Sequence, residues 1–197
     1  MKGRILTCFQ NRRWDGGFQT LRQLINKGAL GDVKEAEIVY DFENAPWLHT
    51  MTAKKYTPGD GMAFGLGTHS VDQAVTLFGR PKSVTAFFRA QRGIESEVED
   101  SFTIILQYGG PQKDLLVTVK TAVTSPVAEQ LKFYVRGTKG SYIKVCMTPA
   151  DRQTTPTLTK PPSTNNAAPA LRRNRSRQAP SPSTRASASS RMTCAAC

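Results

Sequence analysis

The residues best suited to chemistry lie in one glycine-rich stretch, residues 59–74 (GDGMAFGLGTHSVDQA). Glycine lets the backbone approach a ligand closely because it carries no Cβ atom. His69 follows these glycines where a helix is predicted to begin, and Asp72 comes three residues later on about the same face. An imidazole placed in this way can donate or accept a proton near neutral pH. The alternative is that His69 only caps or packs the helix and that Asp72 balances the helix dipole.

Part of this stretch imitates a dinucleotide-binding fingerprint. The pattern Gly65-x-Gly67-x-x-Ser70 has serine where the third glycine belongs, no convincing strand precedes it, and no acidic residue lies about 20 residues later. The turn at residues 137–140 has the wrong spacing for a phosphate-binding loop. The sequence therefore predicts no cofactor-binding residue, and no metal site, in this chain.

Two amphipathic helices are predicted to position these groups. The first begins after Asp15, a plausible N-cap, and ends before Gly28. The second spans about residues 68–78 and ends at Gly79 and Pro81. Their apolar residues recur at helical spacing: Phe18, Leu21, Leu24 and Ile25 in the first, and Val71, Ala74, Val75 and Phe78 in the second.

The rest of the apolar pattern predicts strands joined by turns. Residues 44–66 are expected to form a loop, and residues 137–140 a hairpin turn. The predicted strands cover residues 4–10, 36–42, 83–90, 99–108, 115–123, 130–136 and 141–145. Two helices followed by a meander of strands indicate an α+β fold, a mainly antiparallel open sheet with helices packed on one face. The other face is only partly polar and could pair with another subunit, so a homo-oligomer is expected.

The composition changes near residue 147. Residues 151–197 hold eight Lys or Arg and one acidic residue, so +7 of the net charge of +12 lies there. This Ser-, Pro- and Arg-rich tail has too little apolar surface to offset chain entropy and is expected to be disordered. A basic segment can bind nucleic acid in a salt-dependent way, but no aromatic residues interleave with the arginines, so no specific nucleic-acid partner is predicted.

Neither secretion nor membrane insertion is predicted. The four cysteines (Cys8, Cys146, Cys194 and Cys197) are too few and scattered for a disulfide framework. The apolar run at residues 5–9 is too short for a signal peptide, and nothing approaches the roughly 20 apolar residues of a membrane span. We therefore expect a soluble cytoplasmic protein.

Five segments, in order, resemble the glucose–fructose oxidoreductase / inositol dehydrogenase / MocA family. They are FQNRRWD (residues 9–15), GALGDV (28–33), LGTHSVDQA (66–74), LFGRP (77–81) and VRGTKGSY (135–142). Each is weak alone, but five in the right order and spacing over about residues 5–145 are a specific signal. Residues 1–13 would then link to a dinucleotide-binding domain, residues 14–147 would form the substrate-binding and oligomerisation domain, and residues 148–197 the tail.

The resemblance implies an oxidoreductase that moves a hydride between NAD or NADP and a sugar, polyol or related compound. His69 matches the family's histidine that handles the hydroxyl proton. Asn11, Arg12 and Arg13 match the segment that enters the substrate cleft, and Asp72 is a further candidate for substrate binding. The family often has an aspartate four residues before the histidine, where this chain has Gly65.

The family's cofactor-binding half and its Glu-Lys-Pro lysine have no counterpart in this chain. We therefore expect an incomplete chain, either a truncated product or a gene-model error, that neither binds NAD or NADP nor reacts alone. The alternative is a non-catalytic β-sheet module for dimerisation or scaffolding.

Overall fold

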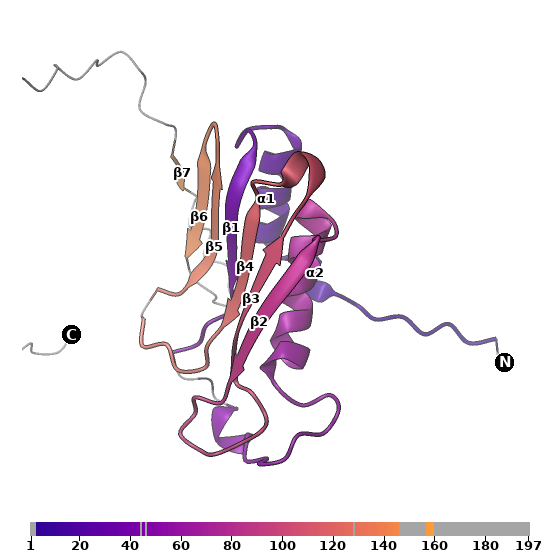
Figure 1. Cartoon of the computed structure of the whole chain (residues 1–197), viewed down its shortest axis with the longest axis vertical. Coiled ribbons are helices and arrows are strands. Elements are labelled where there is room, and N and C mark those ends of the chain that lie inside the picture. The colour runs from indigo at the N-terminus through magenta and orange to yellow at the C-terminus, as the bar shows by residue number, and fades with distance from the viewer. Residues whose placement is uncertain (1–2, 44, 46, 128, 146–156, 160–197) are drawn as a thin grey trace, which may run out of the picture. The chain divides into compact units, whose positions relative to one another are not determined.

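A twisted sheet carries two helices on one of its faces (Figure 1). This computed structural model describes residues 3–43, 45, 47–127, 129–145 and 157–159, and all of them belong to one compact unit, residues 1–162. The helices are α1 (Gly16–Asn26) and α2 (Thr68–Phe78). The strands are β1 (Val33–Val39), β2 (Ser83–Arg89), β3 (Ser101–Gln107), β4 (Leu116–Thr121), β5 (Leu131–Gly137), β6 (Ser141–Val145) and β7 (Thr157–Thr159). The predicted α+β class is confirmed.

The strand order, β2-β3-β4-β1-β5-β6-β7, places the first strand in the middle of the sheet. β1 runs parallel to β4 and antiparallel to β5, and every other pair is antiparallel. The sequence predicted a meander of neighbouring strands, and β1 interrupts it. Ala36 and Ile38 of β1 are fully buried, as expected for a strand that pairs on both sides beneath a helix layer.

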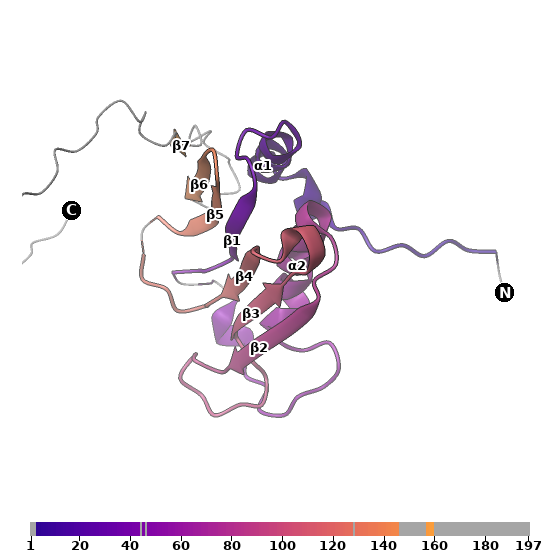
Figure 2. The same cartoon turned by 45° about the horizontal axis from the view of Figure 1, so that its top comes forward.

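The core lies between the helices and the sheet, and both helices lie against the same face (Figure 2). Phe18 and Leu21 of α1 and Ala74 and Phe78 of α2 are buried, as the helical spacing of the apolar residues predicted. They pack against the buried sheet residues Ala36, Ile38, Phe102, Leu106, Val117, Val119, Phe133, Val135 and Tyr142. This core fixes the two helices, and with them the groups at their N-terminal ends.

Two predicted elements differ from the structure. The segment at residues 4–10 is not a strand, and Ile5 and Leu6 are 97% and 98% exposed. An apolar run becomes a strand only where another strand pairs with it, and none does so among the described residues. In the predicted tail, Thr157–Thr159 pairs with β6 as β7, and the remaining tail residues lie outside the described part.

The predicted loop at residues 44–66 also contains helical turns. A π-helical turn, η3 (Ala63–Gly67), runs directly into α2, so His69 lies in the second turn of a continuous helix rather than at its mouth. π-Helical turns are often found at functional sites. The short 3₁₀ turns are η1 (Asn11–Trp14), η2 (Leu48–Thr50) and η4 (Gly110–Gln112). Among the described residues, no helix is long and apolar enough to cross a bilayer.

Candidate functional site

His69 projects from α2 toward the segment that leads into η1. Its Nδ1 donates a hydrogen bond to Oε1 of Gln10 at 2.7 Å. An amide oxygen can only accept, so this contact keeps the ring hydrogen on Nδ1 and leaves the lone pair on Nε2. No described residue bonds to Nε2, and the ring is half-buried. A neutral imidazole held in this way can accept a proton from a bound hydroxyl group.

The surroundings of His69 favour its neutral form. Burial lowers the pKa of His69, and the positive charges of Arg12 and Lys132 lower it further. The carboxylates of Asp72 and Asp15 act in the opposite direction, but the net shift is downward. At neutral pH the ring is therefore mainly uncharged, the state that a general base requires.

Arg13 and Asp72 join η1 to α2. The guanidinium donates two hydrogen bonds to the carboxylate, from Nε at 2.7 Å and from NH2 at 2.6 Å. The side chain of Arg13 is 51% exposed and that of Asp72 is 16% exposed. The hydrogen bond to Asp72 also raises the pKa of Arg13. Both residues were predicted to bind substrate; that role stays a prediction, and in the structure their polar atoms bind each other.

A buried glutamine, Gln73, supports the same corner. Its Nε2 donates to the backbone oxygen of Arg12 at 2.9 Å, and its Oε1 accepts from the hydroxyl of Tyr40 at 3.2 Å. Burial raises the pKa of Tyr40, so this hydroxyl remains a donor. Gln73 lies one turn after His69, and both side chains bind the segment that contains η1. Sequence reasoning missed Gln73, although a glutamine between the apolar stripe residues of a helix was a usable signal.

Asn11 and Arg12, the other predicted substrate-binding residues, lie in η1. Asn11 is exposed, and Arg12 is partly exposed and lies 3.6 Å from the carboxylate of Asp15. Asp15 stands at the N-cap position of α1, but its side chain makes no capping hydrogen bond. The predicted N-cap position of Asp15 is thus confirmed, but its carboxylate lies beside Arg12 and does not cap the helix. His49, interpreted from the sequence as loop surface, is exposed in η2.

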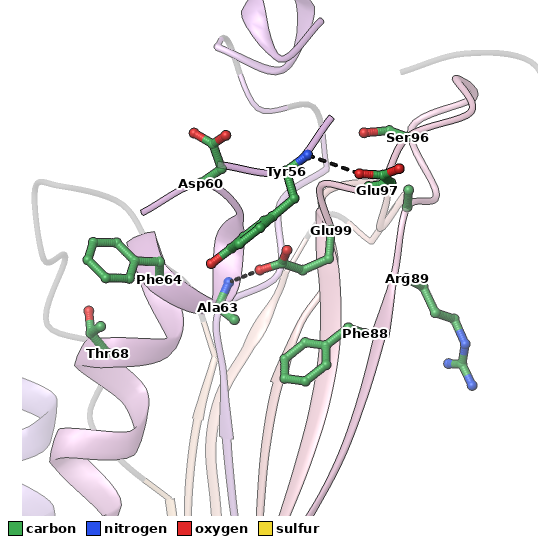
Figure 3. A pocket seen from close by; sticks show the side chains of 11 residues that line it. Tyr56, Asp60, Ala63, Phe64, Thr68, Phe88, Arg89, Ser96, Glu97 and Glu99 are labelled. Carbon is green, nitrogen blue, oxygen red and sulfur yellow. Dashed lines mark hydrogen bonds between the residues drawn. The ribbon is translucent and has the colours of Figure 1, made fainter. Parts of the chain in front are cut away.

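A pocket of about 550 Å³ opens beside η3 and the first residue of α2. Figure 3 shows Tyr56 reaching between Phe64 on the helical side and Phe88 on β2. The remaining lining residues are Asp60, Ala63, Thr68, Arg89, Ala90, Ser96, Glu97 and Glu99. Thr68 lines this pocket but His69 does not, since successive helix residues point about 100° apart. The pocket and the imidazole are thus adjacent, separate features.

The walls of this pocket are held by a buried ion pair. Arg92 and Asp100 are 3% and 0% exposed, and NH1 of Arg92 donates to Oδ2 of Asp100 at 2.9 Å. Arg92 also donates to the backbone oxygens of Met51 and Ala53, which ties two loops together. Across the pocket, the carboxylate of Glu99 accepts from the backbone N–H of Ala63 at 3.0 Å (Figure 3).

Gly65 leaves space where the family's aspartate was expected. A Cβ atom added there would meet only Met62, at 3.9 Å. The structure could therefore hold a longer side chain at this position, but the present chain offers no carboxylate there. Among the described residues, no group of three or more His, Cys, Asp or Glu could hold a metal ion.

Lys132 of β5 is a further buried polar group that the sequence analysis did not identify. It is 4% exposed, its Nζ lies over the ring of Tyr40, and it makes no hydrogen bond among the described residues. The register of β5 against β6 shifts between Leu131 and Phe133, so strict alternation of side chains does not hold at Lys132. Burial lowers the pKa of Lys132 well below its usual value.

Replacing Lys132 by methionine is expected to stabilise the fold by about 1 kcal/mol near pH 7, since the cost of an unpaired buried amine exceeds its attraction to the ring. The unfolded chain binds more protons than the folded chain between the lowered pKa and about 10.4, so wild-type stability rises with pH in that window. The stability gained by Lys132→Met should therefore shrink toward pH 10.

Urea unfolding at pH 7 and at pH 10 measures this gain in the free energy of unfolding, with Lys139→Met on the exposed hairpin as the control. A loss of stability at pH 7 would contradict this account of Lys132.

Comparisons with known proteins agree with the observed fold. A model of the GFO/IDH/MocA C-terminal domain matches residues 18–143. An uncharacterized oxidoreductase of Schizosaccharomyces pombe is 40% identical over 154 residues, which cover 77% of this chain and 42% of the relative. The Bacillus subtilis scyllo-inositol 2-dehydrogenase (NADP(+)) is 34% identical over 143 residues, covering 73% of this chain and 38% of the relative.

A solved oxidoreductase from Bacillus cereus matches with a TM-score of 0.62 and 34% identity, over 73% of this chain and 45% of that one. The chain thus spans about two fifths of the length of the curated relatives it matches. The extent of the family match and these identities lead to one conclusion: the chain belongs to the GFO/IDH/MocA oxidoreductase family, through that family's C-terminal domain.

Proposed function

We propose that this chain supplies the substrate-side domain of an NAD(P)-dependent oxidoreductase that acts on a sugar, polyol or related hydroxy compound. The observation that carries the proposal is the half-buried imidazole of His69, with Nδ1 fixed by Gln10 and Nε2 unbonded by any residue that the structure describes. The name of the Bacillus subtilis relative, an NADP-dependent inositol dehydrogenase, supports both the cofactor and the substrate class.

Oxidation of an alcohol requires that the hydroxyl proton leave as the carbon loses a hydride. Nε2 of His69 is the acceptor for that proton, and the lowered pKa keeps it available near neutral pH. Arg12 and Asn11 are partly or fully exposed on the adjoining η1 turn, where they donate hydrogen bonds to further hydroxyl groups. The Arg13–Asp72 pair holds that turn against α2.

We propose that the nicotinamide cofactor is held by residues other than those that the structure describes. A dinucleotide is held where a strand leads through a glycine turn into a helix. Among the described residues, α1 follows a 3₁₀ turn and α2 follows a π-helical turn. The cofactor therefore belongs to a nucleotide-binding half such as the longer relatives have room for.

A chimera tests this function. The matching 143 residues of the Bacillus subtilis relative would be replaced by those of this chain, keeping the relative's remaining sequence. Fluorescence of bound NADPH would show that the cofactor half is folded. We expect NADP⁺-dependent oxidation of at least one compound in a panel of inositols, aldoses and sugar acids. A folded, cofactor-binding chimera without such turnover would contradict the proposal.

We also propose that the open face of the sheet pairs with a second copy of this chain. Phe87 of β2 and Leu116 of β4 lie on that face and are 47% and 40% exposed. Leu116→Asp is expected to shift the mass measured by light scattering from dimer to monomer. The control, Val84→Asp, places the same charge on the opposite face of β2. A monomeric wild type, or equal effects of both variants, would contradict this pairing.

A further inference from the structure

The pocket beside η3 has the size and the lining of a ligand site, although His69 does not line it. Its volume of about 550 Å³ lies within the range of small-molecule sites, roughly 300–1,000 Å³. Three aromatic side chains, Tyr56, Phe64 and Phe88, line the pocket, and each is more than half exposed. Exposed aromatic side chains that gather in one hollow mark a binding surface. The pocket is therefore a candidate site that is separate from the imidazole.

Side-chain hydrogen bonds between distant loops hold the rim of this pocket in place. The buried guanidinium of Arg92 donates to backbone oxygens within residues 51–53. Glu97 binds the same loop, because it accepts from Nζ of Lys55 at 2.8 Å and from the backbone N–H of Tyr56 at 3.3 Å (Figure 3). A rim that is anchored in this way does not have to be ordered when a ligand binds, and this lowers the entropic cost of binding.

The carboxylate of Glu99 is fitted into the wall of the pocket. Its Oε1 accepts from the backbone N–H of Ala63, and no residue in the described part of the chain donates to its Oε2. A Cβ atom added to Gly61 would clash with both oxygens, and glycine also suits the φ of +94° at that position. The chain thus makes room for a carboxylate that has one oriented oxygen and one oxygen available to a ligand.

The charged groups that line the pocket are mainly negative. Asp60, Glu97 and Glu99 contribute three carboxylates, and Arg89 contributes one cation. Figure 3 shows the guanidinium of Arg89 pointing away from these carboxylates. Lys55 pairs with Glu97, and within the described ranges no cationic side chain forms an ion pair with either of the other two carboxylates. A ligand that suits this pocket therefore supplies hydrogen-bond donors and positive charge.

We propose that this pocket binds a small organic ammonium ion, whose apolar body contacts Phe64 and Phe88 and whose nitrogen donates to Glu99. An ammonium group carries donors and no acceptor, and aromatic rings attract cations as carboxylates do. A sugar hydroxyl both donates and accepts, and a lining rich in carboxylates leaves its acceptor unmatched. The site does not include His69, and this inference does not rest on the proposed function.

Titration of the ¹⁵N-labelled full chain tests the charge requirement with two probes of similar shape, benzylamine, which is cationic at pH 7, and neutral benzyl alcohol. We expect saturable shifts of the Ala63 amide with benzylamine and binding of benzyl alcohol that is weaker by about tenfold, since a hydrogen bond between charged groups is the stronger one. Glu99→Gln keeps an acceptor for the N–H of Ala63 and removes the charge, so it should weaken benzylamine binding by about tenfold. The matched control, Glu95→Gln, changes an exposed residue of the same loop that does not line the pocket, and should leave the affinity unchanged.

Phe88→Leu tests the aromatic wall separately. It should weaken benzylamine binding about two- to fivefold, the effect of one exposed contact between a cation and a ring. Phe87→Leu, on the opposite face of β2, is the control and should have no such effect. Three results would each overturn the inference: no saturable shift with benzylamine, equal affinities for benzylamine and benzyl alcohol, or an unchanged affinity in Glu99→Gln. Saturable binding of myo-inositol in place of benzylamine would identify a polyol site and would also overturn it.

Discussion

Replacing His69 by alanine is expected to lower kcat/KM of the chimeric enzyme by about 10²- to 10⁴-fold, the range that general-base catalysis contributes. The loss follows from the geometry, because Gln10 holds the ring through Nδ1 and no residue in the described part of the chain bonds to Nε2. His69 is half-buried and outside the hydrophobic core, so NADPH binding and the melting temperature should change little. His49→Ala, at an exposed position in η2, is the matched control and should retain full activity.

The pH profile separates a base from a merely structural histidine. Because the pKa of His69 is lowered, the acidic limb of kcat/KM for alcohol oxidation should lie below pH 6.5, the ordinary value for histidine. The carboxylate of Asp72 raises this pKa, so Asp72→Asn should move the limb to lower pH. Arg12 lowers it, so Arg12→Gln should move the limb to higher pH. If the acidic limb of the kcat/KM profile stayed at the same pH in both variants, the pH dependence would belong to another group.

Asp100→Ala is expected to cost about 3–5 kcal/mol of unfolding free energy, because it leaves the buried guanidinium of Arg92 without its partner. Asp100 also accepts hydrogen bonds from the backbone N–H of Gln91 at 2.8 Å and from the hydroxyl of Ser101 at 2.9 Å. The two loops that Arg92 ties together would separate, and the pocket beside η3 would lose its wall. Urea unfolding at pH 7 measures the change. Asp114→Ala is the control, since Asp114 is 64% exposed in a surface pair with Lys34 and should cost no more than about 1 kcal/mol.

The pH dependence of this effect has a definite sign. Burial alone raises the pKa of Asp100, but the hydrogen bonds from Gln91, Arg92 and Ser101 outweigh it and leave the pKa below its usual value. A carboxyl group with a lowered pKa stabilises the fold above its unfolded pKa of about 3.9. This stability is lost as the pH falls through the folded pKa, so wild type and Asp100→Ala should converge in acid. A constant difference down to pH 2 would contradict the assignment.

Sequence periodicity correctly predicted those helices and strands that bury one face and expose the other. The helix predicted at residues 68–78 has those bounds in the structure, because its stripe packs on the sheet and Gly79 ends it with a φ of +79°. The hairpin turn also agrees, with the N–H of Gly137 donating to the oxygen of Gly140. Local spacing carried both predictions, since neither depends on a distant partner.

Features that depend on distant partners were missed. The sequence of β1 alone does not predict that this strand pairs in parallel with β4, which lies about 80 residues later in the chain. Gln10 was assigned to a strand, yet its amide orients the candidate base, because the register of a coil segment against α2 is a tertiary property. The sequence analysis assigned no role to Lys132, and its burial depends on a register shift in β5 that the strand pattern does not reveal. Long-range pairing and register shifts therefore set the limit of prediction from one sequence.

The most direct test of the central claim follows deuterium from the carbon of the hydroxy compound to the nicotinamide in the chimera. The account predicts that NADPH gains one mass unit when the substrate carries deuterium at the reacting carbon, and that His69→Ala slows this transfer at least a hundredfold without weakening NADPH binding. Equal rates of transfer with His69 and with alanine at that position would show that the imidazole takes no part, and would contradict the account.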